Sequence, residues 1–454
     1  MSRSNRREFL GVMSLAASTA LFPGAASLYA DAQNIEIGKP YRGWQEGEMD
    51  IHHIYTGIGE SVFHIFPDGT SMLVDAGDRP YMKYKDNVTP LPNATTHSGE
   101  WIARYIKRVN PGKDQVDYMM ISHFHEDHMG DVNYHAGQTK DRDENYFLTG
   151  ITQVGEFIHF KKGFDRGFPY YRKPVPVKNA TLDNYRKFIA WKMKTDSLSM
   201  EPFKVGRRDQ IKLLKNKTKY ASMFCVQNIC GNGEVWTGDG EETQSFFDLY
   251  PNNKKPVISE NPLSIGVLIG YGPFRYYTAG DVSGKLVDDA GNDIGLEEWG
   301  GAGVGPVDVC KANHHAYKDA MTPGFVKNVQ ANVYVMCVWD NLHIQDNTMT
   351  NMTSKADYDQ DRIICPTMFP AVRKEMYKGA PWRSCVKEES GHVVIKVYDE
   401  GKKYKVYFLD ASNENMTVKA VYGPFVSKPK ESGSSGEKQE QKKDSSGKGG
   451  MMMM

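Results

Sequence analysis

Residues 116–131 read VDYMMISHFHEDHMGD, and they carry the most information about the fold of the chain. Its first part, 116–122, is mostly apolar, which predicts a short buried β-strand. The part that follows carries four side chains able to bind a metal, all within six residues: His123, His125, Asp127 and His128. Three of the chain's 13 histidines fall in these six residues, so a polar loop with unrelated histidines explains the pattern poorly.

The chemistry of these four side chains suits a transition metal. Imidazole and carboxylate groups together favour zinc, with manganese or iron as alternatives. The groups can converge only if the backbone turns sharply after the strand. Gly130 permits such a turn, because glycine adopts positive φ without steric cost. The sequence therefore predicts a metal centre just beyond Ser122.

Three other predicted strands also end in polar residues of this kind. A hairpin with a Pro-Asp-Gly-Thr turn at 67–70 is followed by an apolar run that ends at Asp75. Further along, a second hairpin ends at Asp281, and the apolar run 307–312 leads into His314 and His315. We expect these distant strand ends to fold together around one cation.

The order of these motifs resembles the metallo-β-lactamase fold superfamily. Within it, the chain is most similar to the soluble hydrolase domain of DNA-uptake competence proteins and their secreted relatives. The motifs are H-x-H-x-D-H at 123–128, N-x-x-S at 261–264, T-A-G-D at 278–281 and K-x-x-H-H at 311–315. The resemblance implies an α/β fold, a four-layer αββα sandwich, with a large insertion at about 132–258 and a C-terminal extension at about 340–426.

The resemblance also implies six ligands shared between two metal ions: His123, His125, Asp127, His128, Asp281 and His315. The first two would hold one ion, the next two and the last would hold the other, and Asp281 would bridge them. Asp127 would be the catalytic residue, because it is placed to orient the metal-bound water and accept its proton. Asp75 would be a structural aspartate that hydrogen-bonds near the metal loop.

The sequence departs from the family at the third ligand of the first metal. Most of the superfamily has a histidine upstream of the bridging aspartate, where this chain has Asn261. An amide oxygen is a weaker donor than imidazole, so weaker binding of the first ion, or a single ion at the second position, is expected. His159 is a more distant alternative ligand. His314, Asn261 and His343 are further candidates for binding metal or substrate, and the small Ala316 after the pair favours His315 over His314.

The two ends of the chain are predicted to lie outside the catalytic domain, which spans 33–426. Residues 1–32 carry Arg6-Arg7 before an apolar stretch and end in a small-residue cleavage site, which is typical of a twin-arginine export signal. A periplasmic or secreted location follows. Residues 427–454 are rich in Ser, Gly, Lys and Glu and are predicted to be a disordered tail. No apolar run after residue 30 reaches the ~20 residues of a membrane helix.

Composition limits the function further. The chain has 454 residues with 56 basic and 56 acidic side chains, which excludes a surface built throughout for nucleic acid. Six cysteines without a C-x-x-C pair exclude a zinc ribbon, and Cys225 and Cys230 are the closest candidates for a disulfide, with buried thiols as the alternative.

These features favour an exported zinc hydrolase that uses a metal-bound hydroxide on phosphodiester or other ester bonds. Cations and aromatic rings interleaved over 160–179 fit a small anionic or nucleotide-like ester, or else form a solvated loop, and binding of nucleic acid stays open. The alternatives are a non-catalytic ligand-binding protein with an incomplete metal site, and a lactonase or β-lactamase type of hydrolase. The sequence leaves the oligomeric state open.

Overall fold

The structure is a computed structural model, and it describes residues 36–80, 90–249, 259–284, 286–287, 293–356 and 358–429. The predicted export signal at 1–32 and the tail from residue 430 onward lie outside the described residues. The first residues of the predicted tail do pack on the body, because Ser427 N donates to Lys402 O and Lys428 N donates to Asp308 Oδ1.

The first sheet has nine strands in the order β19-β18-β17-β1-β2-β3-β4-β5-β6. Its N-terminal strands β1, β2 and β3 are antiparallel, whereas β3 to β6 run parallel. The strands are β1 (Met49–His53), β2 (Val62–Ile65), β3 (Ser71–Val74), β4 (Gln115–Ile121), β5 (His159–Asp165), β6 (Ser199–Pro202), β17 (His392–Tyr398), β18 (Lys403–Leu409) and β19 (Val418–Val426).

The second sheet has eight strands in the order β16-β15-β14-β11-β10-β7-β8-β9. It is antiparallel from β11 to β9 and parallel from β11 to β16. The strands are β7 (Phe224–Gly231), β8 (Glu234–Trp236), β9 (Thr243–Ser245), β10 (Gly266–Tyr271), β11 (Phe274–Thr278), β14 (Val309–Lys311), β15 (Val333–Met336) and β16 (Ile363–Pro366). A separate pair is formed by β12 (Leu286–Val287) and β13 (Asp293–Ile294).

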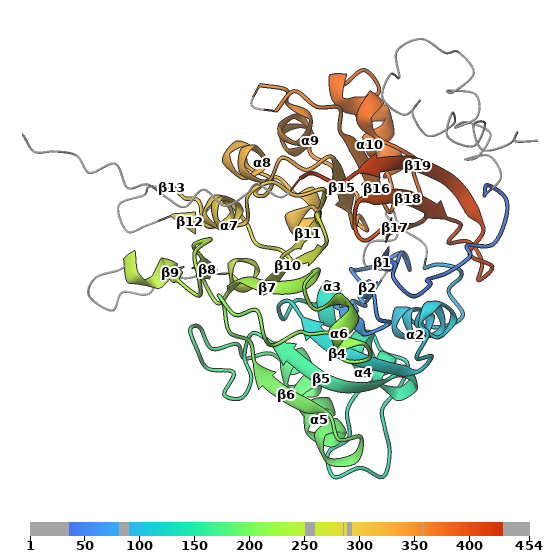
Figure 1. The fold of residues 1–454 in the computed structure, drawn as a ribbon. Helices are drawn as coiled ribbons and strands as arrows, with labels where there is room; N and C mark the ends of the chain where they lie inside the picture. The colour runs from blue at the N-terminus through green and yellow to red at the C-terminus, as the bar shows by residue number, and fades with distance from the viewer. Residues whose placement is uncertain are drawn as a thin grey trace, which may run out of the picture.

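Helices cover the outer faces of both sheets (Figure 1). On the first sheet lie α2 (Ser98–Val109), α4 (Gly150–Phe157) and α5 (Ala180–Thr195), and on the second lie α7 (Leu296–Val304), α8 (Pro323–Val329) and α9 (Asp346–Thr353). Short helices α3 (Glu126–Met129), α6 (Lys217–Tyr220) and α10 (Ala371–Met376) lie in connections. The α2 helix buries Trp101, Ile102, Tyr105 and Ile106, as its apolar spacing predicts.

Three buried clusters separate these layers. One lies between the sheets and includes Ile51, Met120 and Val309. The other two lie between each sheet and its helices, for example around Ile106 of α2 and Phe325 of α8. The chain is therefore an α/β sandwich of two mixed sheets, since each sheet is apolar on both faces.

The predicted insertion and the predicted C-terminal extension both contribute strands to the sandwich. The predicted insertion at 132–258 supplies strands to both sheets, β5 and β6 to the first and β7 to β9 to the second. The predicted C-terminal extension at 340–426 supplies β16 to the second sheet and β17 to β19 to the first, where β17 pairs with β1. Both segments therefore belong to the body of the sandwich, because a strand inside a sheet cannot be removed without exposing its neighbours.

All six cysteines are free thiols. Cys225 and Cys230 lie on the same strand, β7, so their backbones are about 17 Å apart at ~3.4 Å per residue, far beyond the ~7 Å limit for a disulfide. Cys310, Cys337 and Cys365 are buried, which is the commoner state that the apolar runs around Cys310 and Cys337 favour.

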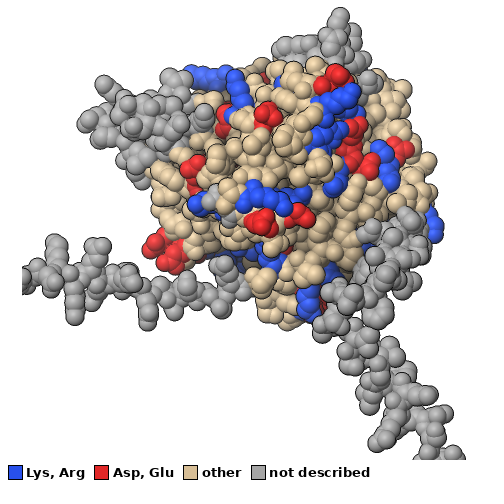
Figure 2. All heavy atoms as spheres, turned by 90° about the horizontal axis from the view of Figure 1, so that it is seen from above, with Lys and Arg blue, Asp and Glu red and all other residues tan. Residues whose placement is uncertain are grey.

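The surface and the helices bear on what the chain can bind. Lys and Arg side chains interleave with Asp and Glu over the face shown in Figure 2, without a dominant patch of either sign. None of the described helices combines the length and the apolar character that crossing a lipid bilayer requires.

Candidate metal centre

Three strand ends from the two sheets form the centre. The metal loop, residues 122–130, follows β4 of the first sheet, and Asp281 and His315 follow β11 and β14 of the second. A backbone hydrogen bond from Ile265 N to Ser122 O, 2.9 Å long, joins the two sheets at this edge. The centre therefore depends on how the sandwich is assembled, and no single segment contains it.

Asp75 holds the metal loop in place from the end of β3. Its Oδ1 accepts from Ser122 N at 2.7 Å, and its Oδ2 accepts from Ser122 Oγ at 2.6 Å and from His128 Nδ1 at 2.8 Å. The next turn approaches even closer, since a Cβ added to Gly77 would lie 1.9 Å from the carbonyl oxygen of Asp127. Only glycine fits there, which explains the Asp-x-Gly pattern after β3.

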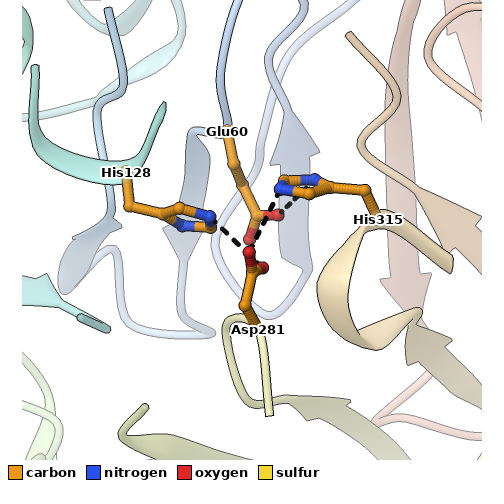
Figure 3. A group of neighbouring side chains, drawn as sticks. All are labelled: Glu60, His128, Asp281 and His315. Carbon is orange, nitrogen blue, oxygen red and sulfur yellow. Dashed lines mark ion pairs between the residues drawn. The ribbon is translucent and has the colours of Figure 1, made fainter. Parts of the chain in front are cut away.

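Four of the predicted ligands converge on one point: Asp127, His128, Asp281 and His315. His128 Nε2 lies 3.2 Å from Asp281 Oδ1, and His315 Nε2 lies 3.4 Å from Asp281 Oδ2 and 3.3 Å from Asp127 Oδ2. All four residues are buried. Figure 3 shows both imidazoles directed at the Asp281 carboxylate from opposite sides.

The tautomers of the two histidines are set by oxygen acceptors on their other nitrogens. His128 Nδ1 donates to Asp75, and His315 Nδ1 donates to the carbonyl oxygen of Cys337 at 2.8 Å. Each Nε2 therefore directs a lone pair into the centre when the ring is neutral. Such an oxygen partner on the second nitrogen is the usual support of a metal-binding histidine.

Buried atoms without hydrogen bonds test whether a cation fits. His128 Nε2 and Asp281 Oδ1 are both buried, make no hydrogen bond, and lie 3.2 Å apart, which is an ion pair only when the ring is protonated. With a neutral ring both atoms are buried electron-pair donors without a partner, which is costly, and a dication between them would satisfy both. Two nitrogen and two oxygen donors suit zinc, manganese or iron, so the donor set fits a transition metal without selecting one.

In the metal-free centre, protons on the two histidines compete with a metal ion for the imidazole nitrogens. Burial raises the pKa of the Asp281 carboxyl, but the neighbouring His128 and His315 outweigh burial and hold the pKa well below its usual value. Burial lowers the pKa of His128 and His315, but Asp281 and Asp127 outweigh it, so the His315 pKa rises to about 9 and that of His128 lies well above 6.5. The carboxylates are thus ionised and ready to bind a cation, which must displace protons from the imidazoles.

The residues predicted for the first metal lie beside this group. His123 Nε2 is 3.8 Å from Asp281 Oδ2 and 3.1 Å from His125 Nδ1. Asn261, in a single 3-10 turn at Asn261–Leu263, donates from Nδ2 to His314 Nε2 at 3.1 Å. His314 Nε2 in turn lies 3.9 Å from Asp281 Oδ2, so His123 and His314 both approach this oxygen, with His125 beside the first and Asn261 beside the second.

His159 and His343 differ in their positions. His159 begins β5 opposite Gln115, at the other end of β4 from the metal loop, and pairs with Asp196, so it takes no part in the centre. His343 is buried and stacks on His315, with ring centroids 4.6 Å apart and an interplanar angle of 11°. Trp339 lies against both rings, and its Nε1 is 3.4 Å from His315 Nε2.

Glu60 is a residue of the centre that sequence reasoning missed. Ligand atoms of Glu60, His128, Asp281 and His315 all lie within 4.8 Å of one another, so this buried cluster could hold a metal ion. Glu60 also pairs with buried Lys311 at 2.9 Å and faces the Nδ1 side of His315 at 3.5 Å. A signal was present, since a lysine inside the apolar run 307–312 needs a buried anion.

Arg79 is the second missed residue. Its Nη1 lies 3.7 Å from Asp127 Oδ1, and its guanidinium carbon lies 5.1 Å from the centre of the Trp339 ring. The side chain is 20% exposed, so Arg79 is the partly solvent-accessible neighbour of the buried Asp127. Nothing in the sequence near Arg79 marks it, because its partners come from α3 and from the loop after β15.

The basic and aromatic stretch 160–179 is partly used for internal pairing. Lys161 pairs with Asp117, Lys162 pairs with Glu201, and buried Arg166 pairs with Glu260 and lies over the Phe124 ring. Because Glu260 also accepts from Phe124 N at 3.0 Å, Arg166 ties the metal loop to the segment that carries Asn261. Half of the cations in this stretch are therefore structural.

No family model matches the chain, and no curated protein matches it.

Proposed function

We propose that this chain is a metal-dependent hydrolase of the metallo-β-lactamase fold superfamily that cleaves phosphodiester or other ester bonds. The observation that carries the proposal is the convergence of His128, Asp281, His315 and Asp127 with their lone pairs directed inward. A metal such as zinc, once bound, acidifies a water molecule and polarises the scissile bond.

Asp127 is the group proposed to handle the proton. Its Oδ2 lies beside His315 and its Oδ1 faces Arg79. Burial raises the pKa of Asp127, but His128 and His315 outweigh burial and hold it well below its usual value, so the carboxylate is ionised at neutral pH. An ionised carboxylate at this position can orient an attacking water and accept its proton.

The side chains next to the centre support attack by water. Ser122 Oγ donates to Asp75, which directs it away from the reacting side. Burial raises the pKa of Cys337 well above its usual value, so its thiol stays protonated. Neither residue is suited to act as a nucleophile.

Arg79 supports an anionic substrate. A partly exposed guanidinium beside Asp127 favours a phosphodiester over a neutral lactone or β-lactam, because it forms charge-assisted hydrogen bonds to phosphate oxygens. A small or nucleotide-like phosphodiester is therefore the proposed substrate class. The mixed charges in Figure 2 offer no extended basic track on that face for a long nucleic acid.

The direct test uses the purified chain without residues 1–32. We expect it to contain at least one equivalent of zinc, manganese or iron by elemental analysis, and to hydrolyse bis-p-nitrophenyl phosphate faster than a lactone or a cephalosporin. Treatment with a chelator should abolish turnover, and zinc should restore it. A chain that holds no metal and turns over no ester would refute the proposal, whereas tight metal binding without turnover would favour the ligand-binding alternative that Asn261 raises.

We also propose that the protein is exported, on the evidence of Arg6-Arg7 and the cleavage pattern before Gln33. Replacing both arginines by lysine is expected to move most of the protein from the periplasmic to the cytoplasmic fraction of an expressing bacterium. An unchanged distribution would argue against the twin-arginine route.

A further inference from the structure

We propose that His314 is the third protein ligand of the first metal position, together with His123, His125 and the bridging Asp281. This inference rests on the proposed function and goes beyond it, since it supplies the ligand whose usual histidine is replaced by Asn261. Two ions would then be held by adjacent residues of one loop, the first by His314 and the second by His315.

The distances place His314 and His123 beside the same oxygen of Asp281. His314 Nε2 lies 3.9 Å from Asp281 Oδ2, and His123 Nε2 lies 3.8 Å from it. His315 Nε2 also faces Oδ2, at 3.4 Å, whereas His128 faces Oδ1, so Oδ2 is the oxygen that both metal positions would share. One cation bound to Oδ2 would lie between this oxygen and each of the two nitrogens, because a metal with bonds of ~2.1 Å to both an oxygen and a nitrogen holds them less than ~4.2 Å apart.

The tautomer of His314 suits a ligand. His314 Nδ1 contacts Asp319 Oδ1 at 2.7 Å, and since an ionised carboxylate only accepts, the proton is on Nδ1. The lone pair of Nε2 is then free to accept: it accepts from Asn261 Nδ2 at 3.1 Å, with Asp281 Oδ2 3.9 Å away, and a bound ion would take the place of the amide contact. The Asp319–His314 pair repeats the Asp75–His128 pair at the second position.

The backbone is distorted to direct two adjacent histidines at one centre. His314, His315 and Ala316 have φ values of 44°, 51° and 58°, all in the left-handed region that non-glycine residues avoid. Adjacent side chains of a regular strand point to opposite faces, but here the two rings lie 6.2 Å apart. Strain of this kind persists where the surrounding structure enforces it, and it gathers at functional sites.

Side chains of α7 and α9 hold the histidine loop in this conformation. Glu297, buried on α7, accepts from Asn313 Nδ2 at 2.9 Å and from the backbone nitrogens of Met321 and Thr322. Thr348 Oγ1 donates to Ala316 O at 2.9 Å. These contacts brace both sides of the histidine pair, so its position does not depend on a bound ion.

The side-chain oxygen of Asn261 is available to the metal centre. Its Nδ2 contacts His314, while its Oδ1 is buried and has no hydrogen-bond partner. The amide therefore occupies the place of the missing histidine as a neighbour of His314, and the imidazole supplies the stronger donor.

The experiment titrates the metal-depleted chain with Zn²⁺ by calorimetry and with Co²⁺ by visible absorption. The wild-type chain should bind two ions. His314→Ala should bind the first ion at least 100-fold more weakly and keep the second, whereas His315→Ala should lose the second. Asp319→Asn leaves the imidazole in place and should lower the affinity for the first ion by about 10–100-fold. His159→Ala is the matched control on a surface histidine, and circular dichroism checks that each variant is folded.

The outcomes separate the two proposals. Failure of the wild-type chain to bind any Zn²⁺ or Co²⁺ would refute the proposed function itself. Binding of only one ion by wild type, or two ions by His314→Ala with unchanged affinities, would overturn the role of His314 and leave a hydrolase centred on Asp281 and His315. If His314→Ala does not fold, the Asp319→Asn titration decides.

Discussion

Asp281→Asn is expected to lower kcat/KM for bis-p-nitrophenyl phosphate by about 10³-fold or more, because several kcal/mol of metal-dependent stabilisation is lost and each 1.36 kcal/mol is tenfold. The Asp281 carboxylate faces His128 with one oxygen and His315 and His123 with the other. Removing its charge therefore weakens both metal positions together. Zinc content by elemental analysis should fall in parallel with activity.

Asp410→Asn is a suitable control, since Asp410 only accepts hydrogen bonds from Ser412 and Asn413 in a turn after β18. It should leave both zinc content and kcat/KM close to wild type. Full activity of Asp281→Asn with unchanged zinc would contradict the assignment of Asp281 as the bridging ligand.

Asp281→Asn should also change how the stability of the metal-free chain depends on pH. The pKa of His315 rises from 6.5 to about 9 in the folded chain, chiefly because Asp281 outweighs burial. A raised folded pKa stabilises the fold fully below pH 6.5, and this contribution is lost as the pH rises through about 9. In the presence of a chelator, Asp281→Asn should thus be less stable than wild type at pH 6, and the difference in urea midpoint should narrow by pH 10.

Local patterns in the sequence predict the parts of this protein that depend on neighbouring residues. The apolar run before His123 predicts β4, and the four candidate ligands that follow are close in space because they are close in sequence. The spacing of apolar residues likewise predicts α2 and the hairpin of β17 and β18. Periodicity shows which face of an element is buried, and this information is available within about ten residues.

What the sequence could not reveal are the partners of these elements. The hairpin β17–β18 reads as a terminal addition, yet β17 pairs with β1 in the middle of the first sheet, with Ile395 opposite Ile51. Arg166 lies in a basic stretch that fits an anionic ligand, yet it is buried against Glu260. In each case the deciding contact joins residues far apart in the chain, and apolar spacing carries no information about which distant segment supplies it.

Lys311→Met is expected to destabilise the metal-free chain by about 3–5 kcal/mol, because it leaves the Glu60 carboxylate buried without its partner. Both side chains are fully buried and their charged atoms are 2.9 Å apart. Lys311 Nζ also donates to Gly280 O at 2.7 Å, next to Asp281. Burial lowers the pKa of Lys311, but Glu60 and Asp281 outweigh it, so the ammonium stays charged. Urea unfolding in the presence of a chelator measures the loss.

Two further variants test whether this loss is specific to the Glu60–Lys311 ion pair. Lys355→Met removes an exposed lysine whose partners Asp359 and Asp361 are almost fully exposed, so it should change stability by no more than about 1 kcal/mol. The double variant Glu60→Leu with Lys311→Met replaces both charges by apolar groups of similar size and should recover most of the stability lost by Lys311→Met alone, since no uncompensated charge is left. If the double variant is as unstable as the single one, the loss comes from packing or from the hydrogen bond to Gly280. The buried ion pair would then not be what places Glu60 beside His315.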